Sequence, residues 1–141
     1  MSTIKGKCLC GGVQFETPAP QAIDVCHCET CQGWVGGPFI GADFFEDGVS
    51  ITKDEGLEWY ASSEWAKRGF CKKCGSSLFY RLNKHPDFWA ITAGSLDLPE
   101  GHQIGKEIFI DSKPGYYAIA GNHPRLTGEE FFASLQGNND E

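Results

Sequence analysis

Seven cysteines stand in three short blocks of the chain, and their type and spacing indicate metal binding. The blocks are KCLCGG at residues 7–12, VCHCETC at 25–31 and FCKKCGSS at 70–77. An odd number of cysteines leaves one unpaired in any set of disulfides, and C-x-C and C-x-x-C spacings suit thiolate chelation better than bridges. The sequence therefore predicts metal sites, with zinc as the metal.

The first and third blocks together offer four thiolates. Cys8 and Cys10 share one face of an extended backbone because they are two residues apart. Cys71 and Cys74 have the spacing of a zinc knuckle, and Gly75 after them lets the backbone turn back. Each pair is half of a tetrahedral Cys₄ site, which is the usual form of a structural zinc. Zinc held in this way would stabilise the fold directly.

The middle block leaves Cys26, Cys28 and Cys31 as a group of three. If residues 25–28 are extended, Cys26 and Cys28 share a face and His27 points the other way. The three cysteines then form an open site, as in a catalytic zinc, and its metal is expected to be labile. Two alternatives stay open. His27 could complete a closed Cys₃His site, or Cys8 and Cys10 could share a site with Cys26 and Cys28.

The elements that must position these cysteines are short. Alternating or apolar runs predict strands at residues 11–17, 38–45, 49–52, 57–62, 77–82, 88–96 and 106–111. One helical turn is expected over 29–34 and a helix over 126–136, where Thr127 and Glu130 fit a capping box. The length predicts a single zinc-binding domain over residues 1–141, with its core at about residues 5–135.

Bulk composition narrows the function classes. The net charge of −7 argues against a general nucleic-acid binder, because phosphate contacts need a basic surface. No apolar run approaches the roughly 20 residues that span a membrane, and no signal sequence is evident, so a cytoplasmic location is expected. The sequence does not indicate an oligomeric state.

One local basic stretch runs against this acidic balance. The segment AKRGFCKKC, residues 66–74, contains Lys67, Arg68, Lys72 and Lys73 and no acid. It predicts either a solvated turn beside the cysteines or a site for the carboxylates of an anionic ligand.

The three cysteine blocks resemble those of the glutathione-dependent formaldehyde-activating enzymes, a family that includes the centromere protein V relatives. The segment KEIFIDSKPGYYAIAGNHPRL, residues 106–126, is similar to that family's tail. The resemblance spans about residues 5–126. It implies a mostly β, Mss4-like β-tent of short antiparallel strands around a Cys₄ zinc site, with a short C-terminal helix.

The resemblance also implies two zinc ions per chain. Residues Cys8, Cys10, Cys71 and Cys74 match the structural zinc ligands, and Cys26, Cys28 and Cys31 match the ligands of the catalytic zinc. The family often carries a basic residue directly after the third of these catalytic cysteines, whereas this chain has Gln32 and Gly33.

The function that follows is a carbon–sulfur lyase-type enzyme that adds a small thiol such as glutathione to an aldehyde such as formaldehyde. His27 and His123 are candidates for the proton transfer by residue type. Two alternatives are a non-catalytic zinc module that binds a protein, and a thiol redox enzyme of the methionine sulfoxide reductase type. An enzyme is favoured over the binding module.

Overall fold

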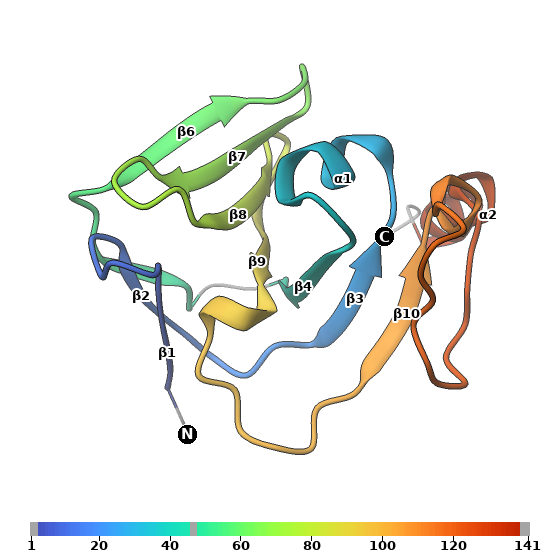
Figure 1. Ribbon diagram of the computed structural model, residues 1–141, viewed down its shortest axis with the longest axis horizontal. Helices are drawn as coiled ribbons and strands as arrows, with labels where there is room; N and C mark the ends of the chain where they lie inside the picture. Colours follow the sequence, from blue (N-terminus) through green and yellow to red (C-terminus); the bar gives the residue numbers. More distant parts are fainter. Residues whose placement is uncertain (1–2, 46–47, 139–141) are drawn as a thin grey trace. The chain divides into compact units, whose positions relative to one another are not determined.

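The computed structural model (Figure 1) describes residues 3–45 and 48–138. The chain packs into two compact units. Unit 1 consists of Met1–Ala22 and Gly41–His102, and unit 2 of Ile23–Ile40 and Gln103–Glu141. The expectation of a single domain stays a prediction.

A small antiparallel sheet opens unit 1. Its strands follow the order β1 (Ile4–Lys7), β2 (Gln14–Thr17) and β5 (Ser50–Lys53). In β1, Ile4 and Gly6 are buried while Lys5 and Lys7 are exposed, which is the alternation of a strand with one face on a core. The turn between β1 and β2 contains Cys8 and Cys10.

Longer antiparallel strands form the rest of unit 1, and they lie side by side in Figure 1. Their order is β4 (Phe39–Phe44, of which Gly41–Phe44 belong to unit 1), β9 (His85–Thr92), β8 (Ser77–Leu82), β7 (Ala66–Cys71) and β6 (Leu57–Ala61). The turn between β7 and β8 contains Cys74 and Gly75, and the short 3₁₀ helix η1 (Ala93–Ser95) follows β9.

Aromatic side chains fill the core of unit 1. The rings of Phe15 and Phe79, both fully buried, meet edge to face with their centres 4.9 Å apart. Trp59 stacks on Phe79 at 5.8 Å, and Trp89 meets Phe79 at 5.3 Å. Such rings bury large apolar areas and fix the strands that carry the third cysteine block.

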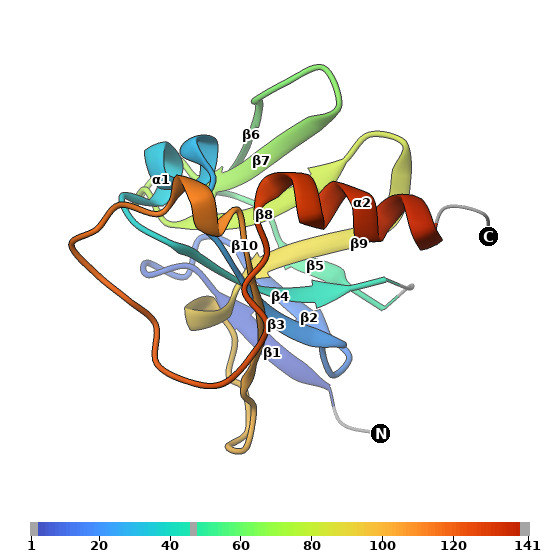
Figure 2. The same ribbon diagram turned by 90° about the vertical axis from the view of Figure 1, so that its right-hand side faces the viewer.

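Unit 2 is built around a parallel pair of strands. Strand β3 (Ala22–Cys26) pairs with β10 (Ile104–Ile108), so that Val25 lies opposite Glu107 and Cys26 opposite Ile108. Helix α1 (Glu29–Val35) follows β3, and the 3₁₀ helix η2 (Ile110–Ser112) follows β10. Residues 113–127 then form a long connection to helix α2 (Gly128–Asn138), seen in orange to red in Figure 2.

Both predicted helices are confirmed. The capping box closes as expected, because Thr127 N–H donates to Glu130 Oε1 at 2.8 Å and Glu130 N–H donates to Thr127 Oγ1 at 3.0 Å. Phe131 and Phe132 of α2 pack against Phe109, which adopts the left-handed conformation with φ 58°. This conformation turns the Phe109 ring towards the helix.

The mostly β fold of short strands with a C-terminal helix is also confirmed. The sequence analysis missed β1, β3 and β7, because β1 and β3 are short and β7 was interpreted only as a basic segment. Trp65 and Tyr116 are exposed, at 63% and 82%, although large aromatic side chains more often lie in the core. Among the described residues, no helix is long and apolar enough to cross a membrane.

Candidate functional site

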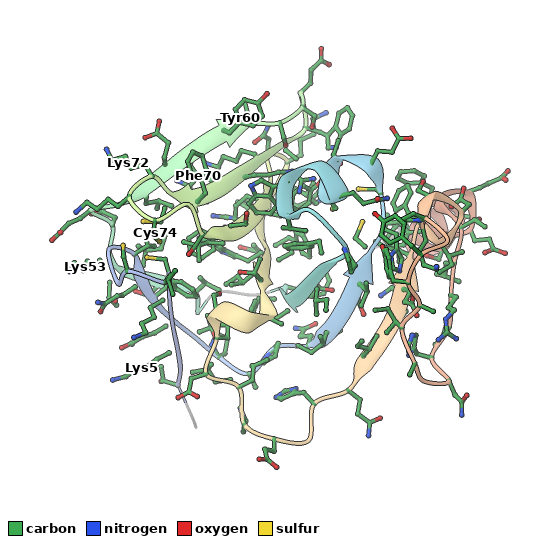
Figure 3. All side chains as sticks on the ribbon, viewed as in Figure 1. Lys5, Lys53, Tyr60, Phe70, Lys72 and Cys74 are labelled. Carbon is green, nitrogen blue, oxygen red and sulfur yellow. The ribbon has the colours of Figure 1, made fainter. Side chains whose placement is uncertain are left out.

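Four cysteine sulfurs gather in unit 1, as the spacing predicted. The Sγ atoms of Cys8, Cys10, Cys71 and Cys74 all lie within 4.8 Å of one another. Cys10 Sγ lies 3.8 Å from both Cys8 Sγ and Cys71 Sγ. Figure 3 shows Cys74 at the turn after β7, next to Lys72. We call this group the Cys₄ centre.

The Cys₄ centre fits a tetrahedral metal. Zinc–sulfur bonds of about 2.3 Å place the four sulfurs of a tetrahedron about 3.8 Å apart, which matches the two distances from Cys10 Sγ. Backbone N–H groups also face the sulfurs: Gly12 N–H donates to Cys10 Sγ at 3.4 Å and Val13 N–H to Cys8 Sγ at 3.3 Å. The group could therefore hold a metal ion, and its donor set is compatible with zinc.

Turns with a left-handed glycine produce this geometry. Gly11 and Gly75 each have φ +81°, and the N–H of Gly75 donates to the carbonyl of Cys71 at 2.7 Å. A β-carbon would be strained at this φ, so glycine lets each turn fold back on its cysteines. Ser76 hydrogen-bonds Cys74 Sγ at 3.2 Å, and this bond, with one from the Ser76 backbone, lowers the pKa of the Cys74 thiol to about 5.

Gly56 is a further requirement of the Cys₄ centre that the sequence analysis missed. Its N–H donates to the carbonyl of Gly12 at 3.0 Å, and its carbonyl accepts from Lys72 N–H at 2.7 Å. A β-carbon at this position would lie 2.6 Å from Cys71 Sγ. Glycine is therefore needed for the close approach of this backbone to the sulfur.

The free energy of unfolding of the variant Gly56→Ala is expected to be about 1–3 kcal/mol lower than that of the wild type, because the added methyl group forces Cys71 Sγ to move. Urea denaturation of the zinc-loaded protein measures the difference. The control is Gly94→Ala, because a β-carbon at Gly94 meets nothing within 4 Å. Equal unfolding free energies for the two variants would contradict the expectation.

The other three cysteines gather in unit 2, and we call them the three-cysteine site. The Sγ atoms of Cys26, Cys28 and Cys31 lie within 4.8 Å of one another. Cys26 ends β3, and Cys28 is the N-cap of α1, where its Sγ accepts from Cys31 N–H at 3.4 Å. The strand end and the first helical turn thus converge on one point, and the group could hold a metal through three ligands.

The crowding of the three sulfurs affects their acidity. Hydrogen bonds from Cys26 and Cys31 lower the pKa of the Cys28 thiol well below its usual value. The hydrogen bonds that Cys26 makes with Cys28 and Cys31 raise the pKa of the Cys26 thiol. Three thiolates this close repel one another, so a bound cation is the natural way for all three to ionise together.

His27 lies on the opposite side of the backbone and is fully buried. Its Nε2 lies 2.7 Å from Glu107 Oε1, and its Nδ1 lies 2.8 Å from the Tyr117 hydroxyl. Both ring nitrogens therefore have protein partners, which argues against His27 as a fourth ligand. The extended backbone that the sequence analysis assumed around residues 25–28 accounts for this orientation.

Glu107 binds three side chains at once. Besides His27, its carboxylate receives His123 Nε2 at 2.5 Å and Arg125 Nε at 2.9 Å, both at Oε2. Burial alone would raise the pKa of Glu107, but the hydrogen bonds from His123 and His27 and the charge of Arg125 outweigh it and hold the pKa below its usual value. The two histidines named from sequence as proton carriers thus share one carboxylate.

Sequence analysis missed Glu107 because its partners lie far apart in the chain. A signal was nevertheless present, since Glu107 is the one acidic residue of β10, a strand that begins and ends with isoleucine. A second feature was also missed: Gln32 Nε2 donates to the carbonyls of His27 at 2.6 Å and Ser112 at 2.9 Å. Gln32, which stands where the family often has a basic residue, holds the loop of the three-cysteine site.

The four basic residues of segment 66–74 have different surroundings. Lys67 Nζ lies 4.5 Å from the Trp59 ring centre, whereas buried Arg68 stacks over Tyr80 at 4.7 Å. Lys72 is exposed, and Lys73 Nζ lies 3.6 Å from Glu55 Oε1. Arg68 thus contributes to packing, and the anion site stays a prediction for the exposed lysines.

Comparison with known proteins gives one family. The sequence model described as glutathione-dependent formaldehyde-activating enzyme matches residues 3–112, which include all seven cysteines.

Two individual proteins are similar to the chain. A Schizosaccharomyces pombe protein named as an uncharacterized lyase is 29% identical over 136 residues, covering 96% of this chain and 98% of its own. A crystal structure of a Rhodobacter sphaeroides protein aligns with TM-score 0.59 and 21% identity over 86% of this chain and 98% of that one. At 21% identity, the similarity to the Rhodobacter sphaeroides structure supports the fold alone.

Proposed function

Because the chain belongs to the glutathione-dependent formaldehyde-activating enzyme family, we propose that it is a zinc-dependent carbon–sulfur lyase-type enzyme that joins a small, glutathione-like thiol to an aldehyde such as formaldehyde. The observation that carries the proposal is the convergence of Cys26, Cys28 and Cys31 without a fourth ligand from His27. A metal with three protein ligands keeps a position for a substrate.

Two zinc ions have different roles in this proposal. Cys8, Cys10, Cys71 and Cys74 hold a structural zinc, and Cys26, Cys28 and Cys31 hold a catalytic zinc that is more easily lost. When bound at the three-cysteine site, zinc supplies a soft Lewis acid that favours the thiolate form of a thiol near neutral pH. The rest of the site is built from the chain's own groups.

The chemistry needs no oxidant or reductant. The thiol loses its proton and its sulfur bonds to the aldehyde carbon. The carbonyl π electrons move to the oxygen, and a proton equivalent to the one lost returns there. The product of glutathione and formaldehyde is S-hydroxymethylglutathione, with every atom of both reactants retained.

The protein's contribution is to hold the three ligands at a fixed spacing. Cys31 N–H donates to Cys28 Sγ, which fixes the N-terminal turn of α1 on the site. Gln32 binds the carbonyl of His27, and His27 N–H donates to the carbonyl of Ile108 at 3.1 Å. Preorganised ligands bring thiol and aldehyde together without reordering the loop.

The contacts of His27 also bear on the alternatives. A closed Cys₃His centre would favour the protein-binding module, and the partners of both His27 nitrogens argue against such a centre. The redox alternative needs a cysteine without metal, so it predicts at most one zinc per chain.

The test is an exchange measurement with ¹³C-formaldehyde and glutathione by NMR. These reagents combine spontaneously, so the enzyme is expected to raise the exchange rate between formaldehyde hydrate and S-hydroxymethylglutathione in proportion to its concentration. Cys28→Ser with zinc in its Cys₄ centre is the matched control and is expected to leave the spontaneous rate unchanged. A wild type that carries both metals and does not accelerate exchange would overturn the proposed reaction.

A further inference from the structure

The side chain of Glu107 is 1% exposed, and it lies at the centre of a buried polar network in unit 2. Its two oxygens receive His27, His123 and Arg125 at 2.7, 2.5 and 2.9 Å. Only an ionised carboxylate can accept from all three, because a carboxylate offers acceptors on both oxygens and no donor. A glutamine here would place an NH₂ group against at least one of these donors.

The network has a direction. Since Glu107 only accepts, His27 Nε2 carries a hydrogen, and the Tyr117 hydroxyl is the hydrogen-bond partner of His27 Nδ1 at 2.8 Å. Burial, with the charges of Tyr116 and Glu107, raises the pKa of Tyr117, so its hydroxyl keeps its hydrogen at neutral pH. Glu107, His27 and Tyr117 thus form one chain of hydrogen bonds.

The middle residue of this chain, His27, stands between two ligands of the three-cysteine site. His27 is the residue between Cys26 and Cys28 in the sequence. Because its ring is held by hydrogen bonds, the backbone that sets the spacing of the two cysteines is held as well. The backbone of His27 is also bound directly, because its N–H donates to Ile108 and its carbonyl accepts from Gln32. The backbone between these two cysteines therefore has little freedom once the imidazole is bound.

The same carboxylate holds the connection of residues 113–127. Arg125 Nη2 donates to the carbonyls of Ile119 at 2.7 Å and Gly121 at 3.0 Å, while its Nε is bound to Glu107. The backbone of Glu107 also bonds this segment, with N–H donating to Pro124 and carbonyl accepting from Leu126. Tyr117 lies in the same segment, so both ends of the network depend on Glu107.

We propose that Glu107 is a positioning residue for the three-cysteine site: it orients His27 between Cys26 and Cys28, and with Tyr117 it keeps these ligands at metal-binding distance. The inference rests on the proposed function, since it requires that the three cysteines hold zinc. It concerns how firmly the metal is held, because Glu107 does not touch the sulfurs itself.

The same strand pair offers a matched control. Asp24 of β3 is also mostly buried, and its Oδ2 lies 2.8 Å from Lys106 Nζ of β10. Asp24→Asn therefore removes a carboxylate from the same parallel pair without touching His27. A purely structural role of buried charge in β3 and β10 would affect both variants alike.

The experiment follows zinc release from the fully loaded, full-length protein to a chromogenic chelator. Wild type is expected to release its zinc in two phases, and the phase that disappears in Cys28→Ser belongs to the three-cysteine site. Glu107→Gln is expected to accelerate that phase about 10-fold or more, the size of effect usual for outer partners of metal ligands. The phase of the Cys₄ centre and the release from Asp24→Asn are expected to match wild type.

The outcomes separate the two claims. Two phases in wild type, with the three-cysteine phase of Glu107→Gln within about twofold of it, would overturn the positioning role and leave the proposed function standing. Equal acceleration in Asp24→Asn would do the same. A single wild-type phase that Cys28→Ser does not change would overturn the second zinc, and the inference with it.

A second variant covers the case in which Glu107→Gln does not fold. Tyr117→Phe removes only the hydroxyl at the end of the hydrogen-bond chain. It is expected to accelerate the same phase at least about twofold, less than loss of the carboxylate. A folded Tyr117→Phe with an unchanged three-cysteine phase would overturn the proposal in that case.

Discussion

Replacement of Cys71 by serine is expected to remove the metal of the Cys₄ centre and, with it, the cooperative unfolding transition. Cys71 is fully buried, and its sulfur lies 3.8 Å from that of Cys10. A structural zinc contributes about 10–16 kcal/mol to folding, and a whole domain is stable by only about 5–15 kcal/mol. Loss of one ligand therefore removes an amount comparable to the total stability.

Thermal unfolding followed by circular dichroism, together with the zinc content, measures this effect. The comparison is Cys28→Ser, which removes a ligand from the three-cysteine site instead. A Cys71→Ser protein with the wild-type melting temperature and zinc content would contradict the structural role of the Cys₄ centre.

Replacement of Cys28 by serine is expected to leave a folded protein without catalysis. Serine is itself a favoured N-cap, so it can accept from Cys31 N–H as the sulfur does, and α1 keeps its first turn. The change of the N-cap itself is therefore expected to cost no more than about 1 kcal/mol. A hydroxyl is a far weaker ligand for zinc than a thiolate, so the second metal and the acceleration of thiol exchange are expected to disappear.

Zinc analysis, thermal unfolding and the ¹³C-formaldehyde exchange assay are needed together for this variant. Retention of the wild-type exchange rate in a Cys28→Ser protein would contradict the proposed site. Loss of the fold in this variant would show that the three-cysteine site itself stabilises the folded protein.

The cysteine chemistry could be predicted from sequence because it depends on local spacing. Residues two apart in an extended segment share a face, and this rule alone separated His27 from Cys26 and Cys28. Gly75 marked the turn after the third cysteine block, and its backbone has the left-handed conformation that this turn needs. The capping box of Thr127 and Glu130 was equally local, and it closes as expected.

The buried network of unit 2 could not be predicted in this way. Glu107, His27 and Tyr117 meet only after β3 pairs with β10 in parallel, and no local pattern specifies that pairing. For the same reason the basic segment was interpreted as one surface patch, although Arg68 is in fact buried over Tyr80. Residues adjacent in sequence lie on opposite faces once they belong to a strand.

The central claim is that the protein has one metal that supports the fold and a second, open metal site that binds a thiol. Native mass spectrometry of the intact chain, with and without millimolar glutathione, tests it most directly. The account predicts two zinc ions, one for each cysteine group, and one glutathione adduct that is absent from Cys28→Ser. A single zinc ion and no adduct would contradict it.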